Sequence, residues 1–363
     1  MSDLTRETVE EAIKSYIEPH LEKDLVSTKS VKDIKIDGGN VSVSVVMGFP
    51  VNSVKDDIAE AVKAAVEGVD GVSACEVSVD MKVDAHSVQK SLKPIDNVKN
   101  IIAVASGKGG VGKSTTAVNL ALALAHEGAR VGILDADIYG PSQPRMLGIS
   151  GQPESKDGNT LEPMTSYNLQ AMSIGFLIDE ETPMIWRGPM VTQALEQLLN
   201  DTNWSELDYL VIDLPPGTGD TQLTLAQKVP VSGAVVVTTP QDIALLDARK
   251  GFKMFEKVEV PVLGIVENMS IHICSNCGHE EHIFGEGGGA RMAEQYGVDF
   301  LGALPLELRI REETDSGKPT VVAEPDARPS QIYREIARKA AAKLAMQGKS
   351  YAAKFPNIVI QNN

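Results

Sequence analysis

Apolar residues in the first part of the chain follow two different spacings, which predict helices and strands in alternation. Residues 4–25 and 54–65 carry apolar side chains at helical spacing. Three strand-like runs accompany them, at residues 31–36, 41–46 and about 72–83. An Asp-Gly-Gly-Asn turn signal separates the first two runs, so they should form a hairpin. The order helix, strand, strand, helix, strand predicts a small α+β domain over residues 1–84.

The pattern changes after residues 85–99, a polar stretch without periodicity that contains Pro94 and is expected to be a linker. Short, fully apolar runs then alternate with segments of helical spacing, and such runs are typical of parallel strands buried on both faces. These runs are residues 100–105, 131–134, 209–212, 234–238 and 262–266. We expect a doubly wound, mainly parallel α/β sheet over residues 100–345, an irregular excursion at 150–182 and a C-terminal tail at 346–363.

The first apolar run leads into a glycine-rich loop with the pattern Gly, four residues, Gly, Lys and a hydroxyl residue. The loop consists of Gly107, Lys108, Gly109, Gly110, Val111, Gly112, Lys113 and Ser114. Glycines let backbone N–H groups converge on phosphate oxygens, and Lys113 and the N-terminus of the following helix add positive charge. The order strand, loop, helix predicts a nucleotide triphosphate site of the P-loop NTPase type. Ser114 would bind Mg²⁺, and Thr115 completes the expected nucleotide-binding residues.

Acidic residues follow two of the later apolar runs, at the sheet edge where α/β proteins bind their ligands. Asp135 and Asp137 come directly after the second run, and Asp213 follows the third. We expect Asp213 to hold Mg²⁺ through its water shell and Asp135 to lie near that shell. Asp137 is the candidate to orient or deprotonate an attacking water. The Pro-Pro-Gly segment after Asp213 is expected to act as a switch that senses the γ-phosphate.

Three cysteines define the candidate metal chemistry. Cys75 falls on one face of a predicted strand and is expected to be a core thiol. Cys274 and Cys277 are three positions apart, so both thiolates can bind one metal ion or one face of a cluster. This pair is half of a four-ligand site. Its alternatives are an iron-sulfur cluster shared across a two-fold dimer, which is the most economical, a zinc or structural site, and a redox dithiol. The candidates to complete a zinc site are His272, His279 and His282.

Composition limits the partners. A formal net charge of −16 disfavours general nucleic-acid binding, because phosphate backbones attract clustered cations. Arg338 and Lys339 lie in a predicted helix and are expected to be solvated there. The chain begins with no basic segment followed by an apolar core, and no stretch approaches the roughly 20 apolar residues that span a bilayer. With few cysteines, these features favour a cytoplasmic protein without nucleic-acid or membrane partners.

Together, the motifs from residue 100 onward resemble the Mrp/ApbC family of P-loop ATPases, which carry and transfer iron-sulfur clusters. The matching stretches are residues 107–114, 135–142, 213–220, 267–270, 274–279, 284–289 and 310–319. The resemblance implies ATP as the nucleotide, adenine recognition by Asn268, and a signature lysine, Lys108, that reaches the nucleotide of the partner chain in a homodimer. It further implies a [4Fe-4S] cluster bound by Cys274 and Cys277 of two chains, obtained from an assembly scaffold and delivered to apo iron-sulfur proteins.

The N-terminal region resembles the iron-sulfur assembly domain that often precedes such ATPases. The usual cysteine before the second helix is absent, since the chain has Met47-Gly48-Phe49-Pro50 there. We therefore expect an interaction or docking module at residues 1–84. For the whole chain the hypothesis is an ATP-dependent iron-sulfur cluster carrier. The alternative is a nucleotide-switched targeting or scaffold ATPase with a structural zinc at the cysteine pair.

Overall fold

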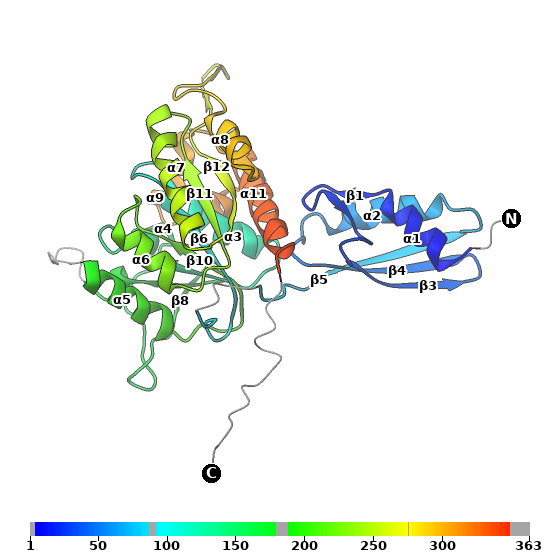
Figure 1. Cartoon of the computed structure of the whole chain (residues 1–363), viewed down its shortest axis with the longest axis horizontal. Coiled ribbons are helices and arrows are strands. Elements are labelled where there is room, and N and C mark those ends of the chain that lie inside the picture. Colours follow the sequence, from blue (N-terminus) through cyan, green and yellow to red (C-terminus); the bar gives the residue numbers. More distant parts are fainter. Residues whose placement is uncertain (1–3, 87–91, 179–187, 275, 349–363) are drawn as a thin grey trace, which may run out of the picture.

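The computed structural model describes residues 4–86, 92–178, 188–274 and 276–348. Most of the expected C-terminal tail and the middle of the expected linker lie outside the described residues. In Figure 1 the N-terminal elements form a separate lobe beside a larger body that holds all later elements. None of the helices in the described part of the chain is long and apolar enough to cross a bilayer.

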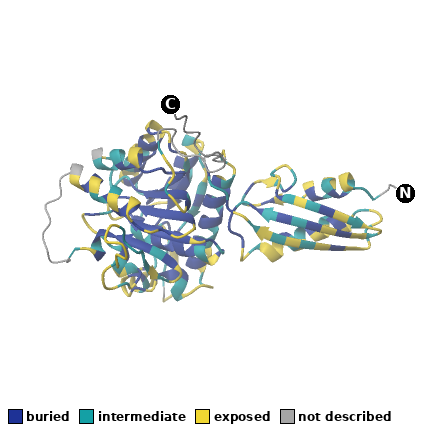
Figure 2. Ribbon diagram, turned by 90° about the horizontal axis from the view of Figure 1, so that it is seen from below, coloured by how far each residue is buried: buried dark blue, intermediate teal, exposed yellow. Residues whose placement is uncertain are grey.

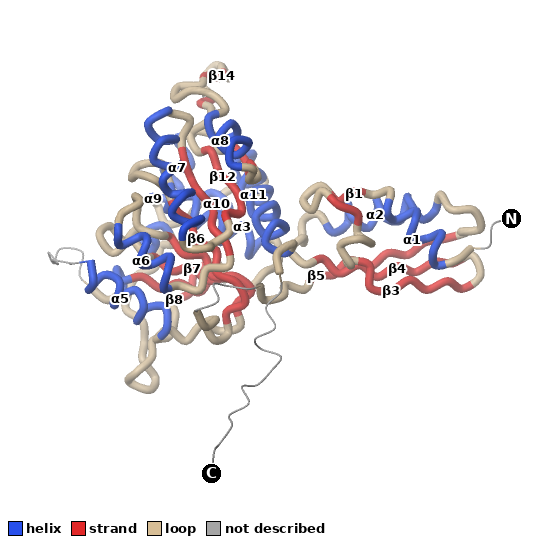
Figure 3. Tube along the Cα trace, viewed as in Figure 1, coloured by secondary structure: helices blue, strands red, loops and turns tan. Residues whose placement is uncertain are grey.

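The N-terminal lobe is a three-stranded sheet with two helices on one face (Figure 3). Its elements are α1 (Arg6–Lys14), β1 (Ile17–Glu18), β2 (Lys23–Asp24), β3 (Val31–Asp37), β4 (Asn40–Met47), α2 (Lys55–Glu67) and β5 (Ala74–Met81). Strands β3 and β4 form the predicted hairpin, and β5 pairs parallel to β4. Alternate residues of β4 are buried against the helices, as the period of two requires. Cys75 is 7% exposed, which confirms it as a core thiol.

The first helix is shorter than the apolar spacing predicts. Helix α1 ends at Lys14, and Ile17 is 53% exposed. Pro19 has no backbone N–H with which to continue a helix. The carboxylate of Glu18 accepts hydrogen bonds from the backbone N–H groups of the two residues after Pro19, at 2.8 and 2.7 Å. The prediction of a helix up to residue 25 is therefore wrong, because local side-chain hydrogen bonds hold this segment in a turn.

The larger body is built on an eight-stranded sheet with the order β15-β12-β11-β6-β10-β7-β9-β8. Its strands are β6 (Val98–Ala105), β7 (Val131–Asp135), β8 (Met164–Ser166), β9 (Leu169–Ser173), β10 (Leu207–Asp213), β11 (Gly233–Thr238), β12 (Val262–Glu267) and β15 (Phe300–Ala303). Neighbouring strands are parallel except for β8 and β9, which confirms the predicted sheet. Every residue of β10 and β11 is buried, since helices cover both faces (Figure 2).

Helices connect these strands, and one small hairpin projects from the body near α8. The helical elements are α3 (Lys113–His126), α4 (Gln143–Met146), η1 (Ile174–Phe176), α5 (Gly188–Asn200), α6 (Asp220–Lys228), α7 (Asp242–Lys257), α8 (Gly288–Tyr296), α9 (Leu308–Asp315), α10 (Thr320–Ala323) and α11 (Arg328–Ala345). The hairpin strands are β13 (His272–Ile273) and β14 (Glu280–Glu281). Central strand β6 has β10 on one side and β11 on the other, so the loop after β6 lies at the switch point where α/β sheets bind ligands.

One expectation about this body is correct only in part, and one is wrong. Residues 150–163 are irregular as expected, but residues 164–173 add β8 and β9 to the sheet; β8 is too short and polar to stand out in the sequence. Arg338 was expected to be solvated, yet it is 9% exposed and lies between α3 and the N-terminal lobe. A guanidinium in such a place requires charged partners, and Arg338 has them in Glu127 and Glu335.

Candidate functional site: a phosphate loop and a cysteine hairpin

The glycine-rich loop connects β6 to α3 in a conformation that requires glycine. Gly110 and Gly112 have φ angles of +79° and +80°, in the left-handed region that side chains rarely adopt. A Cβ at Gly107 would lie 2.1 Å from the backbone of Asp247 on α7, so this glycine also permits close packing. Helix α3 begins at Lys113 and directs its N-terminus into the loop. This is the arrangement by which backbone N–H groups and a helix dipole bind phosphate.

Lys113, Ser114 and Asp213 come together beside this loop. The ammonium of Lys113 bonds to the carboxylate of Asp213 and lies 3.1 Å from Ser114 Oγ. Lys113 is 5% exposed and Asp213 is fully buried, so each charge neutralises the other away from solvent. A cation, a hydroxyl and a carboxylate therefore lie together beside the loop, in an arrangement suited to phosphate and Mg²⁺.

Asp135 organises the loop after β7 rather than facing outward. Its carboxylate accepts hydrogen bonds from the backbone N–H groups of Asp137, Ser142 and Gln143 at 2.9–3.1 Å, and from the hydroxyl of Ser173 at 3.1 Å. Burial, followed by the nearby charge of Asp213, raises the pKa of Asp135 to about 7. These contacts use the oxygens of Asp135 to shape the loop that carries Asp137.

Asp137 itself is partly buried, and this burial raises the pKa of its carboxyl group, while the charge of Lys113 opposes the rise. A carboxylate in that environment is suited to accept a proton or to orient a water molecule. The structure thus brings Asp137 into the electrostatic range of Lys113 and Asp213.

The structure adds Gln143, which the sequence analysis missed. Its Nε2 donates hydrogen bonds to Asp213 Oδ2 at 2.9 Å and to the carbonyl oxygen of Ser114 at 3.2 Å. Its Oε1 and the hydroxyl of Ser142 are buried without a hydrogen-bond partner among the described residues. The unpartnered buried oxygen of Gln143, whose amide nitrogen contacts Ser114 and Asp213, fits a hydrated cation, which would supply a donor to it. A glutamine on a four-residue helix carries no sequence signal that would have found it.

Two further predicted residues border the loop. Asn268 follows β12, and its Nδ2 donates a hydrogen bond to the carbonyl oxygen of Val111 at 2.8 Å. A Cβ at Gly112 would lie 2.1 Å from the same Nδ2, so Asn268 packs directly on the loop. Lys108 is partly exposed, and no ion pair of its ammonium is present within the part of the chain that the structure describes.

The cysteine pair lies at the turn of the β13–β14 hairpin, where Cys274 is partly exposed and Cys277 is exposed. Backbone hydrogen bonds between Cys274 and both His279 and Gly278 close the turn at 2.9 and 2.8 Å. The backbone N–H groups of Cys277 and Asn276, and then the side chain of Cys277, hold the pKa of the Cys274 thiol below its usual value. A low pKa favours the thiolate, which is the form that binds metals.

The histidines near this hairpin do not complete a metal site in one chain. Within the described residues, no group of three or more His, Cys, Asp or Glu side chains is placed to hold a metal ion. His272 Nδ1 lies 3.1 Å from the carbonyl oxygen of Leu306, and His282 Nδ1 lies 2.9 Å from that of Ser270. Cys75 belongs to the core of the N-terminal lobe and is not available to this site. Among the described residues, the pair therefore has no further ligand from its own chain.

A phosphate loop at the switch point of a parallel sheet, with its lysine beside a buried strand-end carboxylate, defines the chain as a P-loop NTPase. Residues 97–341 match a family model described as NUBPL iron-transfer P-loop NTPase, and residues 6–79 match one described as iron-sulfur cluster assembly protein. The chain belongs to the NUBPL iron-transfer P-loop NTPase family, and the resemblance noted from its motifs is confirmed.

One relative covers almost the whole chain, and others cover a large part of it. A protein of Escherichia coli (strain K12), called iron-sulfur cluster carrier protein, is 52% identical over 345 residues, which are 95% of this chain and 94% of the relative. A protein of Pseudomonas fragi with the same name is 61% identical over 275 residues, 75% of this chain and 96% of the relative. A solved nucleotide-binding protein from Archaeoglobus fulgidus, in complex with ADP, is 40% identical with a TM-score of 0.57, covering 64% of this chain and 90% of that one.

Proposed function

We propose that this protein is an ATP-hydrolysing homodimer that binds a [4Fe-4S] cluster between Cys274 and Cys277 of two chains and transfers it to apo iron-sulfur proteins. The observation that carries the proposal is the exposed cysteine hairpin, which presents two thiols, one with a lowered pKa, and no further ligands from the described residues of its own chain. A cluster that needs four thiolates obtains two from each chain of a dimer. The names of the relatives support the same cargo.

The nucleotide would be held by the glycine loop, Lys113, Ser114 and Thr115, with Mg²⁺ on the Ser114 hydroxyl and near Asp213. A bound Mg²⁺ supplies charge neutralisation at the phosphates. Asp135 shapes the loop that presents Asp137, and Asp137 orients or deprotonates the attacking water. Asn268, which packs on the loop, is assigned to adenine, and this assignment favours ATP.

Lys108 and an apolar surface support the dimer. Lys108 is a cation on the loop without an ion pair among the described residues, and we assign it to the γ-phosphate in the partner chain. Large apolar side chains are exposed on elements that border the loop: Tyr139 is 62% exposed, Ile243 69% and Leu246 54%. Ile243 and Leu246 lie on α7, which packs against Gly107. Exposed apolar residues gathered around a site are typical of an interface, here with a second copy of the chain.

The proposed coupling is that ATP closes the dimer and hydrolysis relaxes it, which changes how far the cluster is exposed. A cluster donor such as an assembly scaffold and apo iron-sulfur proteins are the expected partners. A reducing compartment such as the cytoplasm keeps both cysteines as thiols able to bind the cluster.

Metal and sulfide analysis after anaerobic purification tests the cargo. We expect brown protein with iron and sulfide near four of each per dimer, as the cluster formula requires. Cys274→Ala should be colourless and free of iron. Colourless wild-type protein that contains zinc and no sulfide would overturn the carrier function and support a nucleotide-switched scaffold with a structural metal.

Lys113→Ala tests the role of ATP separately. This variant should lose ATP turnover, and its preloaded cluster should no longer pass to an apoprotein in response to ATP. Cluster transfer at the wild-type rate in the absence of ATP turnover would show that hydrolysis does not drive transfer. Chain-exchange or sedimentation measurements with and without ATP test the dimer, and a protein that remains monomeric in both conditions would contradict it.

A further inference from the structure

The end of α3 that is remote from the phosphate loop contacts the N-terminal lobe. Glu127 follows the last residue of α3 and is fully buried. Its Oε1 accepts a hydrogen bond from Ser53 Oγ at 2.5 Å, and its Oε2 accepts one from the backbone N–H of Ser53 at 2.9 Å. The carbonyl oxygen of Glu127 accepts a third from the backbone N–H of Asn52 at 3.2 Å. The loop between β4 and α2 is therefore bonded to the C-terminal end of the phosphate-loop helix.

Arg338 on α11 completes this contact. Its Nη1 donates hydrogen bonds to Glu127 Oε1 at 2.6 Å and to Ser53 Oγ at 2.9 Å, and its Nη2 donates one to Glu335 Oε2 at 2.8 Å. Its Nε donates a hydrogen bond to His20 Nε2 at 3.1 Å, so the guanidinium of this residue, which is 9% exposed, contacts two carboxylates, the Ser53 hydroxyl and an imidazole ring. Because a buried charge that loses its partner is destabilising, these residues depend on one another.

A histidine of the N-terminal lobe extends the cluster. His20 Nδ1 lies 2.7 Å from Glu18 Oε1, and His20 Nε2 lies 3.0 Å from Glu335 Oε2. Glu18 is 1% exposed, so it belongs to the interior of the contact. We call the six residues that join the two parts of the chain the docking cluster: Glu18, His20, Ser53, Glu127, Glu335 and Arg338.

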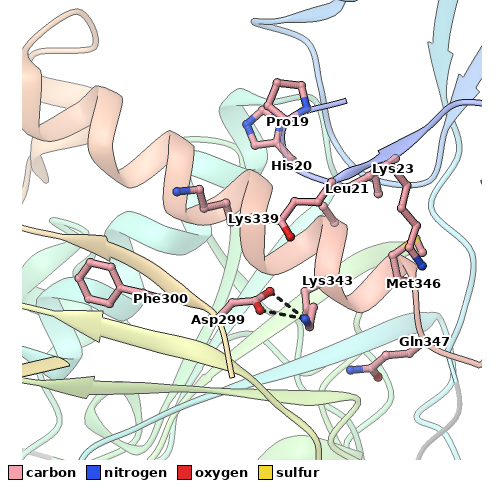
Figure 4. Close-up of a pocket in the computed structure, with 12 residues that line it drawn as sticks. Pro19, His20, Leu21, Lys23, Asp299, Phe300, Lys339, Lys343, Met346 and Gln347 are labelled. Atoms are coloured by element: carbon pink, nitrogen blue, oxygen red, sulfur yellow. Dashed lines mark hydrogen bonds and ion pairs between the residues drawn. The ribbon is translucent and has the colours of Figure 1, made fainter. Parts of the chain in front are cut away.

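The backbone after α3 is shaped to receive the lobe. Gly128 has a φ angle of +99°, and a Cβ there would lie 2.4 Å from Asn52 Nδ2 and 2.9 Å from the Met81 side chain. Only glycine allows this approach. Beside the docking cluster the two parts separate, and a cavity of about 470 Å³ lies between the Pro19–Lys23 segment and α11 (Figure 4). Buried apolar residues of the two parts form one contiguous cluster around this polar contact, and interfaces between domains of one chain resemble transient protein–protein interfaces.

From this geometry we infer that the N-terminal lobe is a docking module whose attachment to α3 is thermodynamically linked to the nucleotide. One helix, about 20 Å long, carries Lys113 at the phosphate loop and ends beside Glu127 at the lobe. A phosphate that binds Lys113 in place of Asp213 contacts the first residue of this helix. Helix α11, which carries Arg338, packs along the same helix. Such linkage is reciprocal. If bound nucleotide stabilises the docked lobe by a given free energy, docking of the lobe strengthens nucleotide binding by the same free energy.

This inference rests on nucleotide binding at the phosphate loop, which is part of the proposed function, and is independent of the cluster. The test uses the full chain with Ser53→Asp, which sets a carboxylate against Glu127 without altering the ATPase body. The matched control is Ser42→Asp, on an exposed position of β4 opposite Lys35. Small-angle scattering measures whether the lobe is docked, and titration with ADP and with a non-hydrolysable ATP analogue measures affinity.

We expect Ser53→Asp to increase the radius of gyration. The dissociation constant of at least one nucleotide should change about fivefold or more, which is the size of change that typical couplings between sites produce. Ser42→Asp should match the wild type in both measurements. An undocked Ser53→Asp protein with wild-type affinity for both nucleotides would overturn the linkage.

The double variant Ser53→Asp with Arg338→Glu adds two carboxylates and removes the guanidinium, so the docking cluster cannot hold the lobe. A lobe that stays docked in this variant would overturn the role of the docking cluster. Loss of nucleotide binding by the wild type and by Ser42→Asp would instead contradict the proposed function, so the two failures are distinguishable.

Discussion

Lys113 and Asp213 form an ion pair that is closed off from solvent, although 100 positions separate them in the chain. In the proposed function each has one alternative partner: phosphate for the ammonium, and a hydrated Mg²⁺ for the carboxylate. Without nucleotide, the pair keeps both charges compensated.

Lys113→Met should lower the free energy of unfolding by about 3 kcal/mol, because it leaves Asp213 buried without its cation. The double variant Lys113→Met with Asp213→Asn should recover part of this loss, since no uncompensated charge remains. Urea unfolding of both variants measures the coupling. Lys108→Met is the control and should change stability by less than about 0.5 kcal/mol, because Lys108 is partly exposed. Additive effects of the two substitutions at Lys113 and Asp213 would contradict the pairing.

Gln143→Leu should raise the Mg²⁺ concentration needed for half-maximal ATP turnover and lower that turnover about tenfold. The substitution removes the amide that donates to Asp213 Oδ2, and hydrogen bonds to charged groups contribute about 1.5–3 kcal/mol. Turnover measured against Mg²⁺ concentration provides the test. Gln197→Leu, on an exposed position of α5, should behave as wild type. An unchanged Mg²⁺ requirement in Gln143→Leu would remove Gln143 from the magnesium site.

The contribution of His20 to the melting temperature should be largest below about pH 6.5 and should decrease towards pH 9. Burial opposes protonation of His20, but hydrogen bonds with Glu18 and Glu335 outweigh it and raise its pKa to about 9. The stabilisation from His20 is therefore complete below its ordinary value of 6.5 and is lost as pH rises through about 9. Hydrogen bonds from His20, followed by those from Arg338, lower the pKa of Glu335 to about 2, so its contribution is present above 4.5 and is lost at strongly acidic pH.

His20→Gln checks the origin of this slope, because glutamine keeps hydrogen-bonding capacity without a titrating ring. Between pH 6.5 and 9 the melting temperature of this variant should decline less than that of the wild type, because only the contribution of His20 is removed. His279→Gln, on the exposed cysteine hairpin, should keep the wild-type slope. The same slope in His20→Gln would assign the pH dependence to another group.

The three cysteines should divide into two classes on substitution. Cys75→Ala removes a buried thiol and should lower stability by about 1–2 kcal/mol, with no change in bound iron. Cys277→Ala removes an exposed side chain and should abolish iron binding while leaving the melting temperature of the metal-free protein unchanged. Iron assays and thermal denaturation on both variants make the comparison. Loss of iron from Cys75→Ala with unchanged stability would place Cys75 in the metal site.

The amino-acid sequence alone determined the features that depend on contiguous residues. The phosphate loop was predictable because its function needs glycines, a lysine and a hydroxyl at set spacing within one turn, between a strand and a helix. The parallel sheet was predictable because strands buried on both faces are apolar throughout, as in β10 and β11. The cysteine pair was visible for the same reason, since two residues on one short turn need no distant partner to lie together.

Tertiary structure alone decided the features that depend on which distant residues meet. Gln143 became part of the site because the loop after β7 folds over the end of β10, 70 positions away. Arg338 is buried because Glu127 and Ser53 arrive from two other elements to compensate its charge, a contact across 211 and 285 positions. Charge and polarity place such residues at the surface when the sequence is considered alone, and only the packing of the two parts of the chain supplies the partners that make their burial favourable.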